Sequence, residues 1–278
     1  MLETPSVRPS PSSRRDAATG SADCEAGRTA EPLKLAIPPP SEAADQDREW
    51  CVVATDAGWK QVRFHDYAAI YEIPGLYERL FCDVLHCDSP RTVVRELANS
   101  AGGSLSGYRV LELGAGNGMV GEQLRAHGAR DICGLDILPQ ARAAAERDRP
   151  GTYADYVVGD LTRPTPALRQ RVLERQFDAL VCVAALGFGD IPPQAFRAAF
   201  GTVRNGGLVA FNIRDKFLTA GEHSGFSRLV DELQHDGRLE IVRRHEYVHR
   251  RATTGAPLNY VAVIAKKQSN GVNRRARN

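Results

Sequence analysis

Three acidic side chains lie at the ends of three short apolar runs in the middle of this sequence. Glu112 lies in "RVLELG", Asp136 in "DICGLDI" and Asp160 in "ADYVVGDL". If each run is a strand of one parallel sheet, the carboxylates meet at the carboxyl edge, where such sheets bind ligands. The ends of these runs carry none of the basic residues that phosphate contacts usually recruit. The pattern therefore predicts a ligand that is rich in hydrogen-bond donors and poor in negative charge.

A glycine-rich turn follows Glu112, with Gly114, Gly116 and Gly118 leading into an apolar helical segment. Glycine permits a tight strand-to-helix turn, and the free N–H groups at a helix start favour an anionic ligand group such as a carboxylate. The string from Gly116 to Gly121 also matches the G-x-G-x-x-G dinucleotide pattern. A carboxylate at Glu112 would repel a pyrophosphate, so the sequence disfavours a nicotinamide cofactor. We expect Gly121 to allow close packing on the sheet instead.

The spacing of the other two acids indicates the parts of the ligand. Asp136 follows Gly118 by 18 residues, close to the spacing of about 20 at which an acid accepts hydrogen bonds from ribose hydroxyls. Asp160 can accept a hydrogen bond from an adenine amine, and Glu112 suits a cationic amino group. S-adenosylmethionine carries this set of groups: an amino group, a carboxylate, a sulfonium, a ribose and an adenine.

Alternating strand and helix patterns must position these residues. Strands are predicted over residues 108–114, 131–137, 154–161, 177–186, 208–213, 239–250 and 258–267, and helices over 118–129, 139–148, 192–203 and 225–237. This order is typical of an α/β fold with a Rossmann-like, doubly wound, mostly parallel sheet and right-handed crossovers. The last two strands are joined by a segment too short for a helical crossover, so they should form an antiparallel hairpin.

The sequence divides into four segments by composition. Residues 1–48 hold seven of the 16 prolines and few large apolar residues, which predicts a disordered extension. Residues 49–108 are expected to form a helical cover, with two helices separated at Pro74-Gly75 and a third over 92–101. Residues 109–267 form the predicted α/β domain, and residues 268–278 form a flexible basic tail.

The motifs "VLELGAGNG", "GLDILPQARAAA", "VVGDL", "FDALVCVAAL" and "VRNGGLVAFNI" resemble, in order and spacing, those of class I S-adenosylmethionine-dependent methyltransferases. The resemblance covers residues 109–267 and implies a seven-stranded sheet with an antiparallel C-terminal strand. It implies that Glu112 and the glycine turn hold the methionine part, Asp136 the ribose and Asp160 the adenine. The segment "FHDYAAIYE" resembles a cofactor-covering region of small-molecule methyltransferases. The cofactor-binding residues expected on these grounds are Tyr67, Glu112, Gly114, Ala115, Gly116, Gly118, Asp136, Ile137, Gly159, Asp160, Leu161 and Val183.

Methyl transfer from such a cofactor is an in-line displacement that demands no particular catalytic side chain, because the methyl group is already activated. A general base is needed only when the acceptor is protonated. The candidates are His65, Asp190 and Arg214. Each has a structural interpretation: a pair between His65 and Asp66, an N-cap by Asp190 for the helix that begins at "PP", and a solvated charge cluster at "RDK". The three tyrosines between residues 67 and 77 are expected to pack in the core or over the cofactor.

Composition restricts the remaining function classes. The net charge of +2 in 278 residues indicates no nucleic-acid partner, and the sequence has no membrane-spanning run or secretory signal. The six cysteines are scattered, which indicates reduced thiols, no metal site and a cytoplasmic location. We expect a small-molecule acceptor, taking the methyl group on oxygen, nitrogen or carbon, and make no prediction of oligomeric state. A protein or RNA methyltransferase, a non-catalytic cofactor-binding module and a nicotinamide-dependent reductase remain as alternatives.

Overall fold

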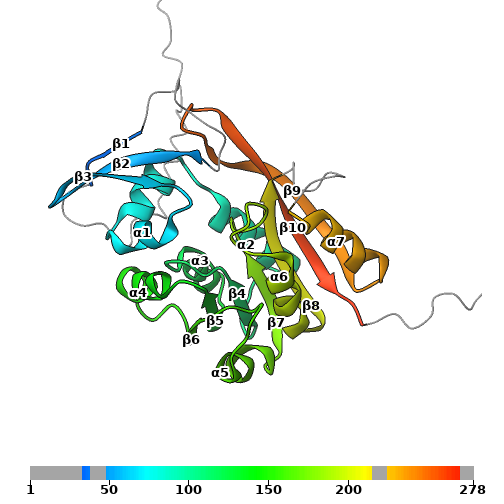
Figure 1. The fold of residues 1–278 in the computed structure, drawn as a ribbon. Helices are drawn as coiled ribbons and strands as arrows, with labels where there is room; N and C mark the ends of the chain where they lie inside the picture. The colour runs from blue at the N-terminus through cyan, green and yellow to red at the C-terminus, as the bar shows by residue number, and fades with distance from the viewer. Residues whose placement is uncertain (1–32, 38–47, 215–223, 270–278) are drawn as a thin grey trace, which may run out of the picture.

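Seven strands form the central sheet in the computed structural model, which describes residues 33–37, 48–214 and 224–269. Their order is β6-β5-β4-β7-β8-β10-β9, and β10 runs antiparallel to both of its neighbours (Figure 1). The predicted α/β fold with an inserted antiparallel strand is confirmed. The strands are β4 (Arg109–Leu113), β5 (Asp131–Asp136), β6 (Asp155–Val158), β7 (Phe177–Cys182), β8 (Val203–Arg214), β9 (Leu239–Arg251) and β10 (Pro257–Lys267).

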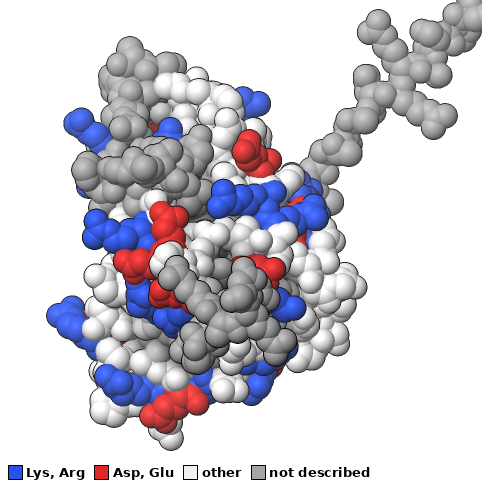
Figure 2. Space-filling model, turned by 90° about the vertical axis from the view of Figure 1, so that its right-hand side faces the viewer, with Lys and Arg blue, Asp and Glu red and all other residues white. Residues whose placement is uncertain are grey.

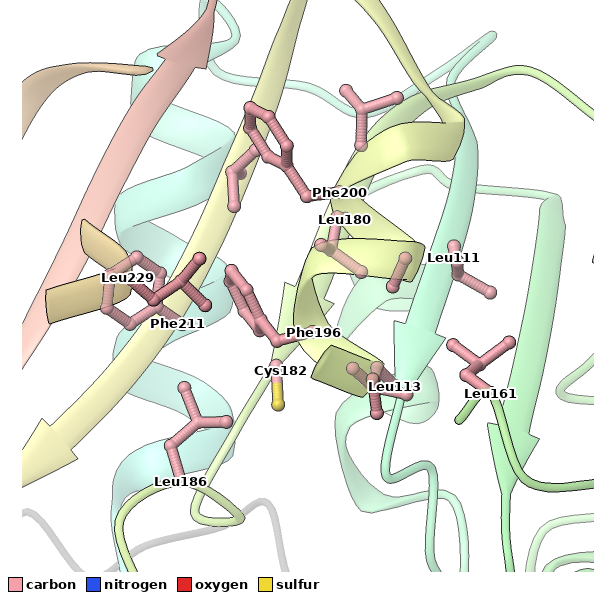
Figure 3. Packing of buried hydrophobic residues seen from close by; sticks show 14 of the residues in the cluster. Leu111, Leu113, Leu161, Leu180, Cys182, Leu186, Phe196, Phe200, Phe211 and Leu229 are labelled. Carbon is pink, nitrogen blue, oxygen red and sulfur yellow. The ribbon is translucent and has the colours of Figure 1, made fainter. Parts of the chain in front are cut away.

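Helices cover both faces of this sheet. Successive strand residues point to opposite faces, so Val110 packs in one core cluster and its neighbour Leu111 in the other. In the cluster that contains Leu111, Phe196 contacts Phe211 edge to face with ring centroids 5.6 Å apart. Figure 3 shows the two side chains between helix and sheet. One face carries α2 (Ser89–Ser100), α3 (Met119–Ala126) and α4 (Pro139–Asp148), and the other carries α5 (Pro166–Leu168), η5 (Arg169–Leu173), α6 (Pro193–Thr202) and α7 (Phe226–His235).

The N-terminal cover differs from the all-helical expectation. It contains a three-stranded antiparallel sheet of β1 (Leu35–Ala36), β2 (Trp50–Thr55) and β3 (Gly58–Arg63), followed by α1 (Tyr67–Glu72) and the π-helical segment η4 (Glu78–Val84). The strands form because Cys51, Val53 and Val62 alternate with more exposed residues and enter one apolar cluster with the helices. Strand β1 lies inside the segment expected to be disordered. Most of that segment and most of the basic tail lie outside the described residues.

The long β9–β10 hairpin joins the cover to the main sheet (Figure 1). A buried ion pair links Arg250 on β9 to Glu49, which also accepts a 2.7 Å hydrogen bond from the Thr253 backbone. Backbone hydrogen bonds connect Asp88 to His249 and Arg251 to Leu85. The cover is thereby held against the hairpin. Within the described ranges, no helix is long and apolar enough to cross a bilayer.

Candidate functional site

A cleft of about 360 Å³ lies where β4, β5 and β6 end, under α1 and the segment that precedes it. This volume lies in the range of small-molecule sites. Eight of the expected cofactor residues line it: Tyr67, Gly114, Asp136, Ile137, Gly159, Asp160, Leu161 and Val183. His65 and Asp190, two of the three catalytic candidates, line the same cleft. The tertiary structure thus brings residues from five separate parts of the sequence to one volume.

A smaller hollow of about 40 Å³ shares Tyr71, Tyr77, Gly114 and Val183 with the cleft. It is also lined by Glu112, Ala115 and Gly116. Gly118, the remaining expected cofactor residue, lines neither space. It has a φ of +91° at the start of α3, and a Cβ there would lie 3.3 Å from Arg149 and Tyr153. Gly118 therefore allows the chain to make the turn into α3 and does not line the binding space.

Glu112 is buried at the floor of the hollow, with 1% of its surface exposed. Its Oε2 accepts a 3.0 Å hydrogen bond from the Tyr153 hydroxyl, whereas Oε1 has no partner among the described residues. Burial raises the pKa of this carboxyl well above its usual range, and the bond from Tyr153 opposes the rise only in part. A buried acceptor without a donor is costly. A cationic donor in the hollow would therefore satisfy it.

Tyr153 positions Glu112, and the sequence motifs did not identify it. Two glycines make room for its ring: a Cβ at Gly121 or at Gly134 would lie 2.8 Å from Tyr153 atoms. The expected close packing at Gly121 is therefore present, but against the residues that precede β6. The signal in the sequence was the pair of glycines on adjacent elements, which leaves a ring-sized space on one face of the sheet.

The backbone N–H groups of the glycine turn are already used within the protein. Those of Gly114 and Ala115 donate to the carbonyl of Leu135, and that of Gly116 donates to the Asp136 carboxylate at 2.9 Å. These three N–H groups therefore already have acceptors within the protein, and the expectation that they hold a ligand carboxylate stays a prediction. They have these acceptors because the turn packs against the end of β5, where Asp136 fixes its shape.

Asp136 combines this structural role with a place in the cleft. Its second oxygen accepts a 3.0 Å hydrogen bond from the Leu138 backbone. Burial raises the pKa of the carboxyl, and the backbone hydrogen bonds oppose that rise. Because each carboxylate oxygen has two lone pairs, both oxygens keep acceptor capacity toward the cleft. Asp136 can therefore accept hydroxyl donors from a ligand while holding the turn.

Asp160 is held in place by its own loop. Its Oδ1 accepts hydrogen bonds from the Thr162 hydroxyl at 2.7 Å and the Thr162 backbone at 2.8 Å. Arg163 contacts the other oxygen at 3.3 Å. The bonds from Thr162 are the main reason that the pKa of this carboxyl lies below its usual value. Asp160 is thus an ionised, oriented acceptor at the third strand end.

Stacked tyrosines cover the glycine turn from the N-terminal side. The ring centroids of Tyr67 and Tyr71 lie 6.1 Å apart, and those of Tyr71 and Tyr77 lie 5.6 Å apart. A Cβ at Gly116 would lie 2.5 Å from the Tyr71 hydroxyl, so only glycine fits beneath it. The Tyr156 hydroxyl donates to the Gly116 carbonyl at 2.7 Å. The turn is therefore clamped by aromatic residues of two different segments.

His65 and Asp190 form a pair across the cleft that the sequence interpretations missed. His65 Nδ1 lies 3.3 Å from the Asp190 carboxylate. Asp66, the expected partner of His65, instead caps α1 by accepting a hydrogen bond from the Ala69 backbone. Asp190 does not cap α6, which begins at Pro193 without a side-chain cap. The pair depends on a fold that brings the two loops together, so neighbouring residues in the sequence gave the wrong partners.

Arg214 does not line the cleft. It is the last residue of β8, opposite Tyr260 of β10. The two charged residues that follow it in "RDK" lie outside the described residues. Among the described residues that line the cleft there is no Lys or Arg, whereas four aspartates line it: Asp66, Asp136, Asp160 and Asp190. The cleft is therefore suited to ligands without negative charge.

The hollow beside Glu112 is lined in part by Ala184, a strained residue after β7. Ala184 has a φ of 56°, in the left-handed region that favours glycine. Its backbone N–H donates to the Asn212 side chain at 2.6 Å, and Asn212 is fully buried. Asn212 in turn donates to Ser89 and Tyr247. This network holds the chain beside the hollow in a conformation that alanine does not prefer.

Part of the cleft lies in a region of the chain that matches known proteins. Residues 111–211 match the family model described as a methyltransferase domain. Methyltransferase-like protein 27 of Homo sapiens is 28% identical over 155 residues, which are 55% of this chain and 59% of that protein. A ubiquinone biosynthesis O-methyltransferase of Pseudomonas entomophila is 30% identical over 109 residues, which are 39% of this chain and 45% of that protein. The chain thus spans about half the length of these curated relatives.

A solved structure is also similar to this chain in fold. The N-methyltransferase NodS from Bradyrhizobium japonicum, in complex with S-adenosyl-L-homocysteine, aligns with a TM-score of 0.54 and 15% identity. The alignment covers 74% of this chain and 98% of that one. At this identity, the likeness concerns the fold.

Proposed function

We propose that this chain, whose residues 111–211 match the model of a methyltransferase domain, transfers a methyl group from S-adenosylmethionine to a small molecule. The proposal places the domain at residues 109–267, with the N-terminal cover closing the cleft. The observation that carries it is the buried Glu112 Oε1, which has no partner among the described residues, beside a cleft whose described lining includes no Lys or Arg.

The residues present fit the cofactor. Its amino group suits the hollow, where Glu112 Oε1 lacks a donor. Its ribose suits Asp136, which keeps acceptor capacity, and its adenine suits Asp160 together with the apolar Ile137 and Leu161. The acidic cleft suits a sulfonium cation. A dinucleotide pyrophosphate would instead lie beside buried Glu112 with no Lys or Arg along the described lining.

When bound, S-adenosylmethionine supplies a methyl group already activated by its positively charged sulfur. The chain's own residues then have three tasks. Glu112 and Asp136 bind and orient the cofactor, the stacked tyrosines exclude water, and the loop after β7 positions the acceptor. Proximity and orientation in a dry site can supply much of the rate enhancement.

Three observations support a small-molecule acceptor. The cleft is bounded by the N-terminal cover and has the volume of a metabolite site. On the side of the molecule formed by β9 and α7, basic and acidic side chains are interspersed in the described part (Figure 2). The name of the Pseudomonas relative, in ubiquinone biosynthesis, also supports a metabolite acceptor. A cytoplasmic location belongs to the same proposal, because none of the five described cysteines forms a disulfide.

Calorimetry and a transfer assay test this proposal. The purified protein should bind S-adenosylmethionine and S-adenosylhomocysteine, and NAD should bind more weakly or not at all. With a labelled methyl group, transfer should occur to a metabolite extract and not to total RNA or protein. Equal or tighter binding of NAD, or label recovered only in a macromolecular fraction, contradicts the proposal.

A further inference from the structure

The pair formed by His65 and Asp190 has a place in the proposed reaction. We infer that His65, oriented by Asp190, takes the proton from an acceptor that carries no negative charge, a neutral hydroxyl compound or an amine. This inference rests on the proposed methyl transfer and deepens it by naming a general base and an acceptor class. It is carried by the geometry of the pair and by the charges that surround it.

The two side chains come from two separate loops that both line the cleft. His65 lies in the segment between β3 and α1, and Asp190 lies between β7 and α6. The His65 side chain is 16% exposed and that of Asp190 is 28% exposed, so both remain accessible from the cleft. The imidazole also contacts Phe188, at 5.3 Å between ring centroids, and Tyr67, at 5.8 Å. Contacts on several sides thus fix the ring.

The pair sets which nitrogen can act as the base. An ionised carboxylate only accepts hydrogen bonds, so the Nδ1 facing Asp190 carries the proton and Nε2 keeps its lone pair. The acceptor's O–H or N–H bond then breaks, and its proton goes to Nε2 of His65. The acceptor lone pair forms the new bond to the methyl carbon, the carbon–sulfur bond breaks, and its electron pair leaves on sulfur. Asp190 stabilises the resulting imidazolium, which returns its proton to water.

The other titratable groups facing this volume do not replace His65. Burial raises the pKa of Tyr67, Tyr71 and Tyr77 well above the usual value, so their hydroxyls stay protonated at neutral pH. Asp66 caps α1 by accepting a hydrogen bond from its backbone. Asp136 and Asp160 line the cleft at the ends of β5 and β6. Histidine is the side chain whose ordinary titration falls between about pH 5 and 8. His65 is therefore the group suited to accept a proton there.

The charge of the cleft determines the acceptor class. Four aspartates and no Lys or Arg line it within the described residues. A carboxylate or phosphate on the acceptor would be repelled without a compensating cation. A neutral hydroxyl compound avoids this repulsion, and an ammonium is attracted before it loses its proton to His65.

The test uses the full chain and the acceptor-active fraction of a metabolite extract. Passed over an anion exchanger at pH 7, the activity should appear in the flow-through. A cation exchanger then separates an amine, which is retained, from a neutral hydroxyl compound, which is not. Activity retained on the anion exchanger overturns the acceptor class.

Two variants test the base. With the flow-through fraction, the wild-type rate should rise between about pH 5 and 8. His65→Gln should lose about 100-fold or more and flatten this rise, and Asp190→Asn should show a smaller loss in the same direction. Cofactor affinity by calorimetry should stay within about twofold in both variants, which shows that they fold. His235→Gln, on the exposed end of α7, is the matched control and should keep the wild-type profile.

The outcomes separate the two proposals. Cofactor binding and methyl transfer with an unchanged pH profile in His65→Gln overturn the general base and leave the proposed function intact. Absence of both cofactor binding and transfer in the wild-type protein overturns the proposed function itself.

Discussion

Replacing Glu112 by glutamine should stabilise the ligand-free protein and weaken its cofactor binding. Glu112 is buried, accepts one hydrogen bond from Tyr153, and has one oxygen without a partner among the described residues. Glutamine keeps the size and can still accept from Tyr153. It removes the cost of holding a carboxyl in this environment, and it also removes the negative charge that a ligand ammonium would use.

The magnitude is limited, because the amide NH2 that replaces Oε1 is itself left without a partner. Removing the charge that burial disfavours should stabilise the variant by about 1 kcal/mol at pH 7. This corresponds to a melting temperature higher by about 2 to 4 °C for each kcal/mol. Loss of a hydrogen bond to a charged group should weaken cofactor binding by about 1.5 to 3 kcal/mol, which is roughly 10- to 150-fold.

The pH dependence has a definite sign. The folded pKa of Glu112 is raised by burial, so the folded state binds more protons than the unfolded state above the unfolded value of about pH 4.3. The free energy of unfolding contributed by this group therefore falls as the pH rises from there toward the raised pKa. Glu112→Gln should remove this contribution, and its advantage over wild type should shrink as the pH approaches about 4.

Urea unfolding of the ligand-free proteins between pH 4 and 8, with calorimetry of cofactor binding, measures both effects. Glu146→Gln is the matched control, because this glutamate lies on the exposed surface of α4 with its side chain 61% exposed. The control should change neither stability nor affinity appreciably. A ligand-free Glu112→Gln protein that is less stable than wild type at pH 7, with an unchanged pH slope, would refute the reasoning.

Three further substitutions test residues that form the candidate site or stabilise the fold around it. Gly121→Ala should lower the free energy of unfolding in urea by about 1 to 3 kcal/mol, because the new Cβ would lie 2.8 Å from Tyr153; an unchanged midpoint would show that the ring can shift. Arg250→Met should cost about 3 to 5 kcal/mol in the same assay, because it leaves Glu49 buried without its partner; a loss below 1 kcal/mol would contradict this. Asp136→Ala should weaken cofactor binding in calorimetry by about 1 to 3 kcal/mol; unchanged affinity in a folded variant would exclude Asp136 from the site.

The strands of the main sheet were predictable because their signal is local. Runs such as 109–113 and 131–136 are short and apolar, and glycine or proline ends them before a helix begins. Strand β2 alternates buried Cys51 and Val53 with less buried residues, whereas β3 buries only Val62; the helical spacing that follows these strands dominated the interpretation of that segment. Strand β1 has two residues, and only its pairing with β2 makes it a strand.

The glycine turn shows a second limit of prediction from the sequence. The sequence indicates that a tight turn occurs after Glu112, because glycine permits the positive φ angles found at Gly114 and Gly116. It does not indicate where the turn's N–H groups point. Three of them donate hydrogen bonds to the end of β5, two to the Leu135 carbonyl and one to the Asp136 carboxylate.

The sequence by itself determined the parallel sheet, the glycine turn and the three acids at successive strand ends, because each follows from patterns within a few residues. Tertiary structure alone decided that Tyr153 lies against Glu112 and that His65 meets Asp190, 125 residues away along the chain. Such contacts depend on how the cover and the loops pack on the sheet. Their side chains carry no local signal, since the same residues could equally have capped a helix or paired with a neighbour.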